Sequence, residues 1–138
     1  MSKIKVFVSY DHSEDAHYKN LLKAWSANPR FDFEFDQRSP DVAINSIYAP
    51  AIQSALTTMM KQADYLLVLI GSKSYNSNWM NWEIQRAKQA DVKLKLVAVK
   101  LSYYNTTPGG LLNSSTSFAN SFTQDAIILA LDKATNNY

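Results

Sequence analysis

Trp79 and Glu83 are the residues of this chain whose types and spacing point most directly to chemistry. They lie four positions apart, so on a helix they would share one face. A lone carboxylate beside a large aromatic surface can stabilise positive charge that develops on a substrate. Both residues also fit a structural role, because a glutamate near a helix start interacts favourably with the helix dipole and tryptophans are often largely buried.

A buried strand is expected just before this pair. Tyr65 to Ile70 are consecutive apolar residues bounded by Asp64 and Gly71, a pattern typical of a central parallel strand that is covered on both faces. In open α/β sheets, ligands bind beyond the carboxyl ends of such strands. The segment that contains Trp79 and Glu83 should therefore lie near a binding site.

The remaining pattern predicts strands that alternate with helices. Strands are expected at Ile4 to Ser9, Phe31 to Asp36, Tyr65 to Ile70 and Leu94 to Val99. A first helix should carry the apolar residues from Tyr18 to Trp25 and end around Asn28-Pro29, and further helices are expected at Ala49 to Gln62 and Trp79 to Ala90. The strict alternation of apolar and acidic residues in the second strand indicates one solvated face, near an edge of the sheet.

The carboxyl-terminal part differs in composition. Residues 102–124 are rich in Ser, Asn, Thr and Gly, so we expect a long polar loop with room for a short edge strand. We expect this loop to be more mobile than the sheet and to cover the site or a partner surface. A last helix is expected at 123–134. Residues 1–138 then form a single α/β domain with a flavodoxin-like, three-layer fold and a parallel sheet of four to five strands in the order 2-1-3-4-5.

Composition excludes several classes of function. The net charge is +2 and no run of Lys or Arg is present, so neither nucleic acid nor a membrane surface is an expected partner. The chain has no cysteine, which excludes disulfides and thiolate metal sites. No secretory segment or membrane span is evident, so we expect a cytoplasmic protein. His12 and His17 are five positions apart and lack a third ligand, so no metal site is predicted.

Several separated motifs resemble the TIR (Toll/interleukin-1 receptor) domain family. They are Phe7-Val8-Ser9-Tyr10 followed by Ser13, Glu14 and Asp15, then Phe35-Asp36, Leu67-Val68-Leu69-Ile70 and Ser77-x-Trp79-x-x-x-Glu83. The Ile70-Gly71-Ser72 ending and the spacing from Trp79 to Ile84 are similar to the prokaryotic branch that includes the TIR-like sensor subunit of Thoeris antiphage systems. The resemblance spans roughly residues 3–101. The segment from Asp36 to Pro40 lacks the glycine of many TIR domains, which counts against adaptor-type signalling through that loop.

The resemblance implies cleavage of NAD at the nicotinamide glycosidic bond, with Glu83 as the catalytic residue. It also implies that the substrate is bordered by Ser9, Tyr10, Asp11, Asp36 and Trp79. Nicotinamide is already cationic in NAD and leaves readily, so one carboxylate can suffice to stabilise the oxocarbenium character of the transition state. NAD would be a substrate and not a cofactor, because the chain has only three glycines and cannot build a dinucleotide fingerprint.

Two functions remain open at this stage. As an enzyme, the protein would make an ADP-ribose-derived, cyclised signal that a separate effector protein reads in antiviral defence. As a non-catalytic TIR-like interaction module, it would act by docking to another protein. Because TIR assemblies commonly self-associate, the resemblance also suggests contacts between copies of this chain.

Overall fold

The computed structural model describes residues 4–12, 15–25, 31–35 and 42–138. The strands are β1 (Ile4–Ser9), β2 (Phe31–Phe35), β3 (Tyr65–Ile70), β4 (Lys95–Lys100) and β5 (Ser117–Ala119). The helices are α1 (Ala16–Trp25), α2 (Ala49–Lys61), α3 (Asn78–Lys88) and α4 (Gln124–Lys133), with short 3₁₀ turns η1 (Ser74–Asn76) and η2 (Gly109–Leu111).

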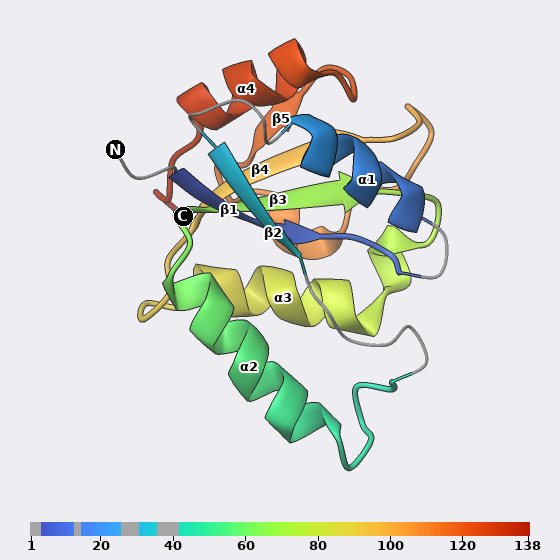
Figure 1. The fold of residues 1–138 in the computed structure, drawn as a ribbon, viewed down its shortest axis with the longest axis vertical. Coiled ribbons are helices and arrows are strands. Elements are labelled where there is room, and N and C mark those ends of the chain that lie inside the picture. Colours follow the sequence, from blue (N-terminus) through green and yellow to red (C-terminus); the bar gives the residue numbers. More distant parts are fainter. Residues whose placement is uncertain (1–3, 13–14, 26–30, 36–41) are drawn as a thin grey trace.

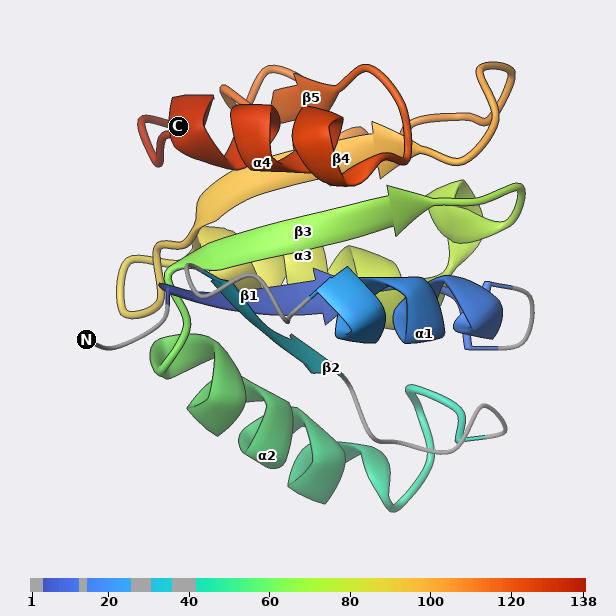
Figure 2. The same ribbon diagram turned by 45° about the horizontal axis from the view of Figure 1, so that its top comes forward.

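The strands form one parallel sheet in the order β2-β1-β3-β4-β5. This confirms the predicted flavodoxin-like α/β fold and strand order, with β3 in the centre and β2 at an edge. Helices α1 and α4 cover one face of the sheet, and α2 and α3 cover the other (Figure 1). The carboxyl ends of β1, β3 and β4 point to the same side of the molecule (Figure 2).

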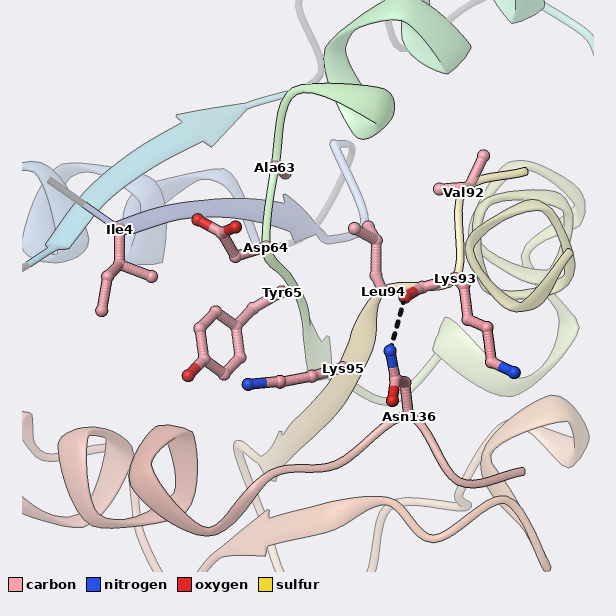
Figure 3. Close-up of a pocket in the computed structure, with 9 residues that line it drawn as sticks. All are labelled: Ile4, Ala63, Asp64, Tyr65, Val92, Lys93, Leu94, Lys95 and Asn136. Carbon is pink, nitrogen blue, oxygen red and sulfur yellow. Dashed lines mark hydrogen bonds between the residues drawn. The ribbon is translucent and has the colours of Figure 1, made fainter. Parts of the chain in front are cut away.

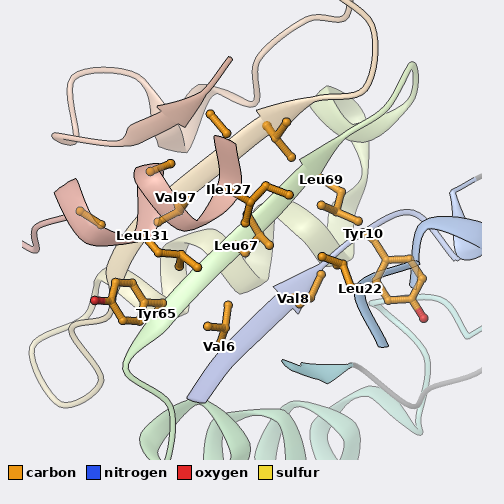
Figure 4. Packing of buried hydrophobic residues seen from close by; sticks show 14 of the residues in the cluster. Val6, Val8, Tyr10, Leu22, Tyr65, Leu67, Leu69, Val97, Ile127 and Leu131 are labelled. Carbon is orange, nitrogen blue, oxygen red and sulfur yellow. The ribbon is translucent and has the colours of Figure 1, made fainter. Parts of the chain in front are cut away.

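Two apolar clusters separate the layers. The α1/α4 cluster contains the buried residues Val6, Val8, Tyr10, Leu22, Phe35, Tyr65, Leu67, Leu69, Val97, Val99, Ala119, Ile127, Ala130, Leu131 and Ala134 (Figure 4). The α2/α3 cluster contains Phe7, Ala49, Leu56, Met60, Leu66, Val68, Ile70, Trp79, Met80, Ile84, Ala87, Leu94, Leu96, Ala98 and Leu111. Because β3 contributes to both, all of its residues are buried, as the continuous apolar run predicted.

Alternation along β1 decides which side chains reach each layer. Val6 and Val8 join the α1/α4 cluster, whereas Phe7 between them joins the α2/α3 cluster. Successive strand side chains point to opposite faces. Ser9 therefore follows Phe7 toward α3, and Tyr10 follows Val8 toward α1.

Side-chain caps explain where two helices begin. Ser77 Oγ accepts a hydrogen bond from the Met80 N–H at 3.2 Å, and α3 begins at the next residue, Asn78, one position before the predicted start. Thr123 Oγ1 caps α4 in the same way by accepting from the Ala126 N–H. Such caps satisfy N–H groups that have no partner within the helix. Among the described residues, no helix has the length and apolar character needed to cross a membrane.

The segment between β4 and β5 is held against the body of the protein. Leu111 is buried in the α2/α3 cluster, and Lys88 of α3 donates from Nζ to both the Gly110 carbonyl and Ser114 Oγ at 2.9 Å. Asn105 is buried and donates from Nδ2 to the Ile70 carbonyl at 2.8 Å. The polar composition of 102–124 thus reflects side chains that bond to backbone as well as side chains that face solvent, and β5 lies within it at the sheet edge.

The amino-terminal edge of the sheet is closed by the last residues of the chain. A hollow of about 380 Å³ lies there, and Asn136 crosses it to donate from Nδ2 to the Lys93 carbonyl (Figure 3). Tyr138 lies nearby and donates from its hydroxyl to the Leu94 carbonyl at 2.6 Å and toward the Ala87 carbonyl at 3.2 Å. Desolvation by burial raises the pKa of Tyr138 to about 12.

Tyr138 should make the protein sensitive to alkaline pH. The pKa of Tyr138 is raised above its unfolded value of 10, so its contribution to stability is fully present below pH 10 and is lost as pH rises through about 12. Across this window, the free energy of unfolding should therefore fall less with rising pH in Tyr138→Phe than in the wild type. Urea unfolding at several alkaline pH values measures this, with Tyr103→Phe as a control at an exposed tyrosine. An unchanged slope in Tyr138→Phe would contradict the assignment.

Candidate functional site

Glu83 lies on the face of α3 that packs against the sheet. Its side chain is fully buried, as are Met80 and Ile84 on the same face. Helix spacing places these residues together because positions three or four apart share a side of the helix. A fully buried glutamate among apolar neighbours is unusual, since burial penalises its charged form.

The Glu83 carboxyl group is held from the end of β1. Ser9 Oγ donates a hydrogen bond to Glu83 Oε1 at 2.7 Å, and Ser9 is itself fully buried. The two residues are 74 positions apart in the chain, so only the fold brings them together. The structure thereby joins two of the residues that the sequence analysis singled out, at the carboxyl end of a central strand.

Trp79 anchors the start of α3 to a distant segment. Its indole Nε1–H donates to the Val42 carbonyl at 2.7 Å, and its ring packs edge to face against Trp82 at 6.0 Å. Trp79 is buried in the α2/α3 cluster, one helical turn before Glu83. The ring therefore forms part of the apolar surroundings on the Glu83 side of the sheet and ties residue 42 to that region.

Tyr10 lies on the other face of the sheet from Glu83. It is buried in the α1/α4 cluster, where its ring stacks on His12 at 4.3 Å and meets Phe35 edge to face at 6.2 Å. Strand alternation causes this separation from Ser9. The structure therefore does not bring the Tyr10 side chain together with Glu83, although both residues lie near the same edge.

Asp11 continues the turn after β1, and its carbonyl accepts from the Asp15 N–H at 2.8 Å at the entry to α1. Asp11 is partly exposed. Asp36, the remaining predicted substrate contact, lies outside the residues that the structure describes.

A crevice opens on the α1 side of the same edge. It has a volume of about 340 Å³ and is lined by Asp15, His17, Tyr18, Gly71, Ser72, Leu101, Ser102, Tyr104 and Asn105. These residues come from the segments that follow β1, β3 and β4. At its floor, the Asp15 carboxylate packs against Gly71, where a Cβ would lie 1.9 Å from Asp15 Oδ2.

The geometry defines two chemically different places at the carboxyl edge, by which we mean the side of the sheet where the strands end. On the α3 side, the buried Glu83 carboxyl group, which accepts from the Ser9 hydroxyl, can stabilise a cation in surroundings of low dielectric. On the α1 side, an open crevice combines aromatic rings with hydroxyl, amide and carboxyl groups. Among the described residues, no group of three or more His, Cys, Asp or Glu side chains could hold a metal ion.

Residues 7–106 match the family model described as Thoeris protein ThsB, TIR-like domain. The chain belongs to this family. It is accordingly a defence-related, TIR-like protein, as the resemblance in its sequence indicated. No curated protein matches the chain. The matched range includes Ser9, Trp79 and Glu83, and it reaches five residues beyond Leu101, the end of the resemblance predicted from the sequence motifs.

The crevice residues of the β4 loop were not identified from the sequence. Tyr104 and Asn105 fall in the polar segment 102–124, for which the composition predicts a loop. A signal was available, because they closely follow the carboxyl end of β4, where α/β folds place ligand contacts. The family match now includes both residues.

Ser9→Ala should destabilise the protein because it removes a donor from a buried carboxyl group. We expect the free energy of unfolding to fall by about 1–3 kcal/mol. Denaturant unfolding measures this, and Ser115→Ala, which removes an exposed hydroxyl bonded to the Asn137 carbonyl, is the control and should cost less than about 0.5 kcal/mol. Equal losses in the two variants would contradict a special role for the Ser9–Glu83 bond.

Gly71→Ala should displace Asp15 and destabilise the crevice. An added Cβ would meet the Asp15 carboxylate at 1.9 Å, and overpacking of this kind costs about 1–3 kcal/mol. Gly109→Ala is a matched control, because nothing lies within 4 Å of a Cβ built there. Thermal unfolding should show a lower melting temperature for Gly71→Ala alone. Equal melting temperatures would mean that Asp15 does not pack on Gly71 as described.

Proposed function

We propose that this protein cleaves NAD at the bond between nicotinamide and ribose, with Glu83 as the catalytic residue. The observation that carries the proposal is the Ser9–Glu83 hydrogen bond of 2.7 Å, which fixes a carboxyl group at the carboxyl edge of the sheet. Membership of the TIR-like family supports the choice of NAD, because the resemblance implies that substrate.

The proposed reaction needs no cofactor. As the glycosidic C–N bond breaks, nicotinamide leaves with the electron pair and becomes neutral, while positive charge develops on the ribose. The Glu83 carboxylate stabilises this charge. Attack by water then yields ADP-ribose and a proton. Attack by a nucleophile within the same ADP-ribosyl group instead yields a cyclised nucleotide, which we propose as the signal for a separate effector protein.

Access to Glu83 is a requirement of this proposal. The side chain has no exposed surface in this structure, so the groups around it must move before NAD can touch the carboxylate. Lids and loops that open and close over active sites are common in enzymes. Tyr10 packs on the other face of the sheet, whereas Trp79 contributes to the apolar wall on the Glu83 side.

The second candidate is a non-catalytic interaction module. Full burial of Glu83 favours it, because a buried carboxyl group bonded to Ser9 can serve the fold alone. Such a module would act through surface contacts with a partner protein or with another copy of this chain.

Glu83→Gln should separate the two functions. The amide keeps the shape of the side chain but lacks the negative charge, so NAD turnover should fall about 100-fold or more, a loss of ~2.7 kcal/mol of transition-state stabilisation. NAD binding should suffer less than turnover. Mass spectrometry of nicotinamide, ADP-ribose and cyclised products measures the reaction, both with purified protein and with lysate of infected cells as a source of activator.

Asp64→Asn provides a matched control for the loss of one negative charge. Asp64 lies at the opposite, amino-terminal edge of the sheet (Figure 3), so this variant should keep the wild-type rate of NAD turnover. Full activity of Glu83→Gln, under conditions where the wild type consumes NAD, would remove the catalytic assignment and favour the interaction module.

A further inference from the structure

We propose that the crevice on the α1 side binds a nucleoside unit, with its base against aromatic rings and its ribose hydroxyls on polar side chains. The proposal concerns binding at a place distinct from Glu83 and does not depend on NAD cleavage. Two sources share this chemistry. One is the adenosine half of a dinucleotide, and the other is a separate nucleoside or nucleotide that regulates the protein.

The position of the crevice in the fold supports a ligand site. From β1, the chain builds the sheet first to one side with β2 and then to the other side with β3. This makes the gap between β1 and β3 a topological switch point, and doubly wound sheets bind ligands outside the carboxyl ends of the strands there. Asp15 follows β1, Gly71 and Ser72 follow β3, and the segment from Leu101 to Asn105 follows β4. The crevice therefore lies where this architecture separates adjacent loops.

Aromatic rings from two different elements line the crevice. Tyr104, on the loop after β4, is 73% exposed and its ring meets Tyr103 edge to face at 5.4 Å. His17 and Tyr18, on α1, have rings 4.0 Å apart. A tyrosine this exposed in the lining of a crevice leaves much of its ring surface open to a ligand, and every nucleobase has a π face that can stack on such a ring.

The polar lining suits ribose better than phosphate. The nine lining residues include Ser72, Ser102, Asn105 and Asp15, but neither Lys nor Arg. A carboxylate can accept hydrogen bonds from two neighbouring hydroxyls, and an acidic residue contacts ribose in this way in dinucleotide-binding folds. Asp15 is only 7% exposed and its Oδ2 is buried over Gly71, so a ligand hydroxyl would meet the Oδ1 side of the carboxylate in partly desolvated surroundings. Its negative charge disfavours a phosphate at the same position.

The size of the crevice fits one nucleoside. Its volume of about 340 Å³ is at the lower end of the range for small-molecule sites, which is roughly 300–1,000 Å³. The hollow at the amino-terminal edge has a similar volume, but the charged side chains of Asp64 and Lys95 in its lining are already engaged. There, Lys95 Nζ lies 5.4 Å from the centre of the Tyr65 ring (Figure 3). Asp64 Oδ2 accepts a hydrogen bond from the Lys5 N–H.

Calorimetric titration of the full chain with adenosine tests the proposal. The wild type should bind adenosine saturably. Tyr104→Leu should raise the Kd for adenosine about tenfold because it removes a stacking ring. Tyr104→Phe retains the ring and should stay within about twofold of wild type. Tyr103→Leu is the matched control, since Tyr103 is 90% exposed and does not line the crevice. It should also stay within about twofold.

The ligand itself provides a second readout. 2′,3′-Dideoxyadenosine lacks the hydroxyls assigned to Asp15 and should bind at least about fivefold more weakly than adenosine. In Asp15→Asn, the affinities for adenosine and for the dideoxy compound should differ less than in the wild type, while the protein remains folded. Absence of saturable adenosine binding, equal losses in the Tyr103 and Tyr104 leucine variants, or equal affinity for the dideoxy compound would each overturn the proposal.

Competition with NAD distinguishes the two sources. If the crevice holds the adenosine half of NAD, then adenosine should compete with NAD and Tyr104→Leu should raise KM with little change in kcat. If it holds a separate nucleoside, then NAD and adenosine should bind together without mutual displacement. Adenosine binding to Glu83→Gln should match wild type in either case, so failure of the catalytic proposal would not be mistaken for failure of this one.

Discussion

The end of β1 divides the carboxyl edge of this protein into two chemically distinct places. Ser9 and Tyr10 are neighbours in the chain, yet strand geometry sends their side chains to opposite faces of the sheet. The Ser9 side chain bonds to the fully buried Glu83 on the face of the sheet that α3 covers. The Tyr10 side chain joins the apolar cluster on the face that α1 covers. The central position of β1 and β3 forces this arrangement, because both faces must be covered by helices.

The two faces of the sheet provide different physical environments at this end. On the α3 face, Trp79 bonds to the Val42 carbonyl and packs into the apolar cluster, so the region around Glu83 is largely desolvated. On the α1 face, Gly71 has no side chain and Asp15 occupies the space above it. The first environment strengthens electrostatic interactions with a developing charge. The second leaves polar groups at the wall of an open crevice, where they can exchange water for ligand hydroxyls.

Long-range periodicity made the fold predictable from the sequence. The continuous apolar run of β3 indicated a central strand, and the alternation of β2 indicated an edge strand. Both follow from how many faces each strand buries. Boundaries were less accurate: β4 begins at Lys95, one residue later than predicted, because Leu94 is buried without pairing in the strand.

The candidate site was only partly predictable. Trp79 and Glu83 were found because helix spacing relates them locally. The Ser9–Glu83 bond joins residues 74 positions apart, and no local pattern encodes such a contact. The position of the Tyr10 side chain could have been predicted from the sequence. Alternate residues of a strand point to opposite faces, so Tyr10 points away from the face that Phe7 and Ser9 share. The resemblance groups Tyr10 with Ser9, Asp11 and Asp36 at the carboxyl ends of the strands, and position at that end does not distinguish the two faces of a sheet.

Burial of Glu83 gives an argument about how such a site would work. Removing a carboxylate from water disfavours its charged form, and the hydrogen bond from Ser9 compensates for part of that loss. A substrate that brings positive charge would compensate further. Because such an interaction would take place in surroundings of low dielectric, it would gain strength as the charge of the proposed NAD substrate moved from the nicotinamide ring onto the ribose. The same burial that makes the resting glutamate costly would then favour the transition state over the free enzyme.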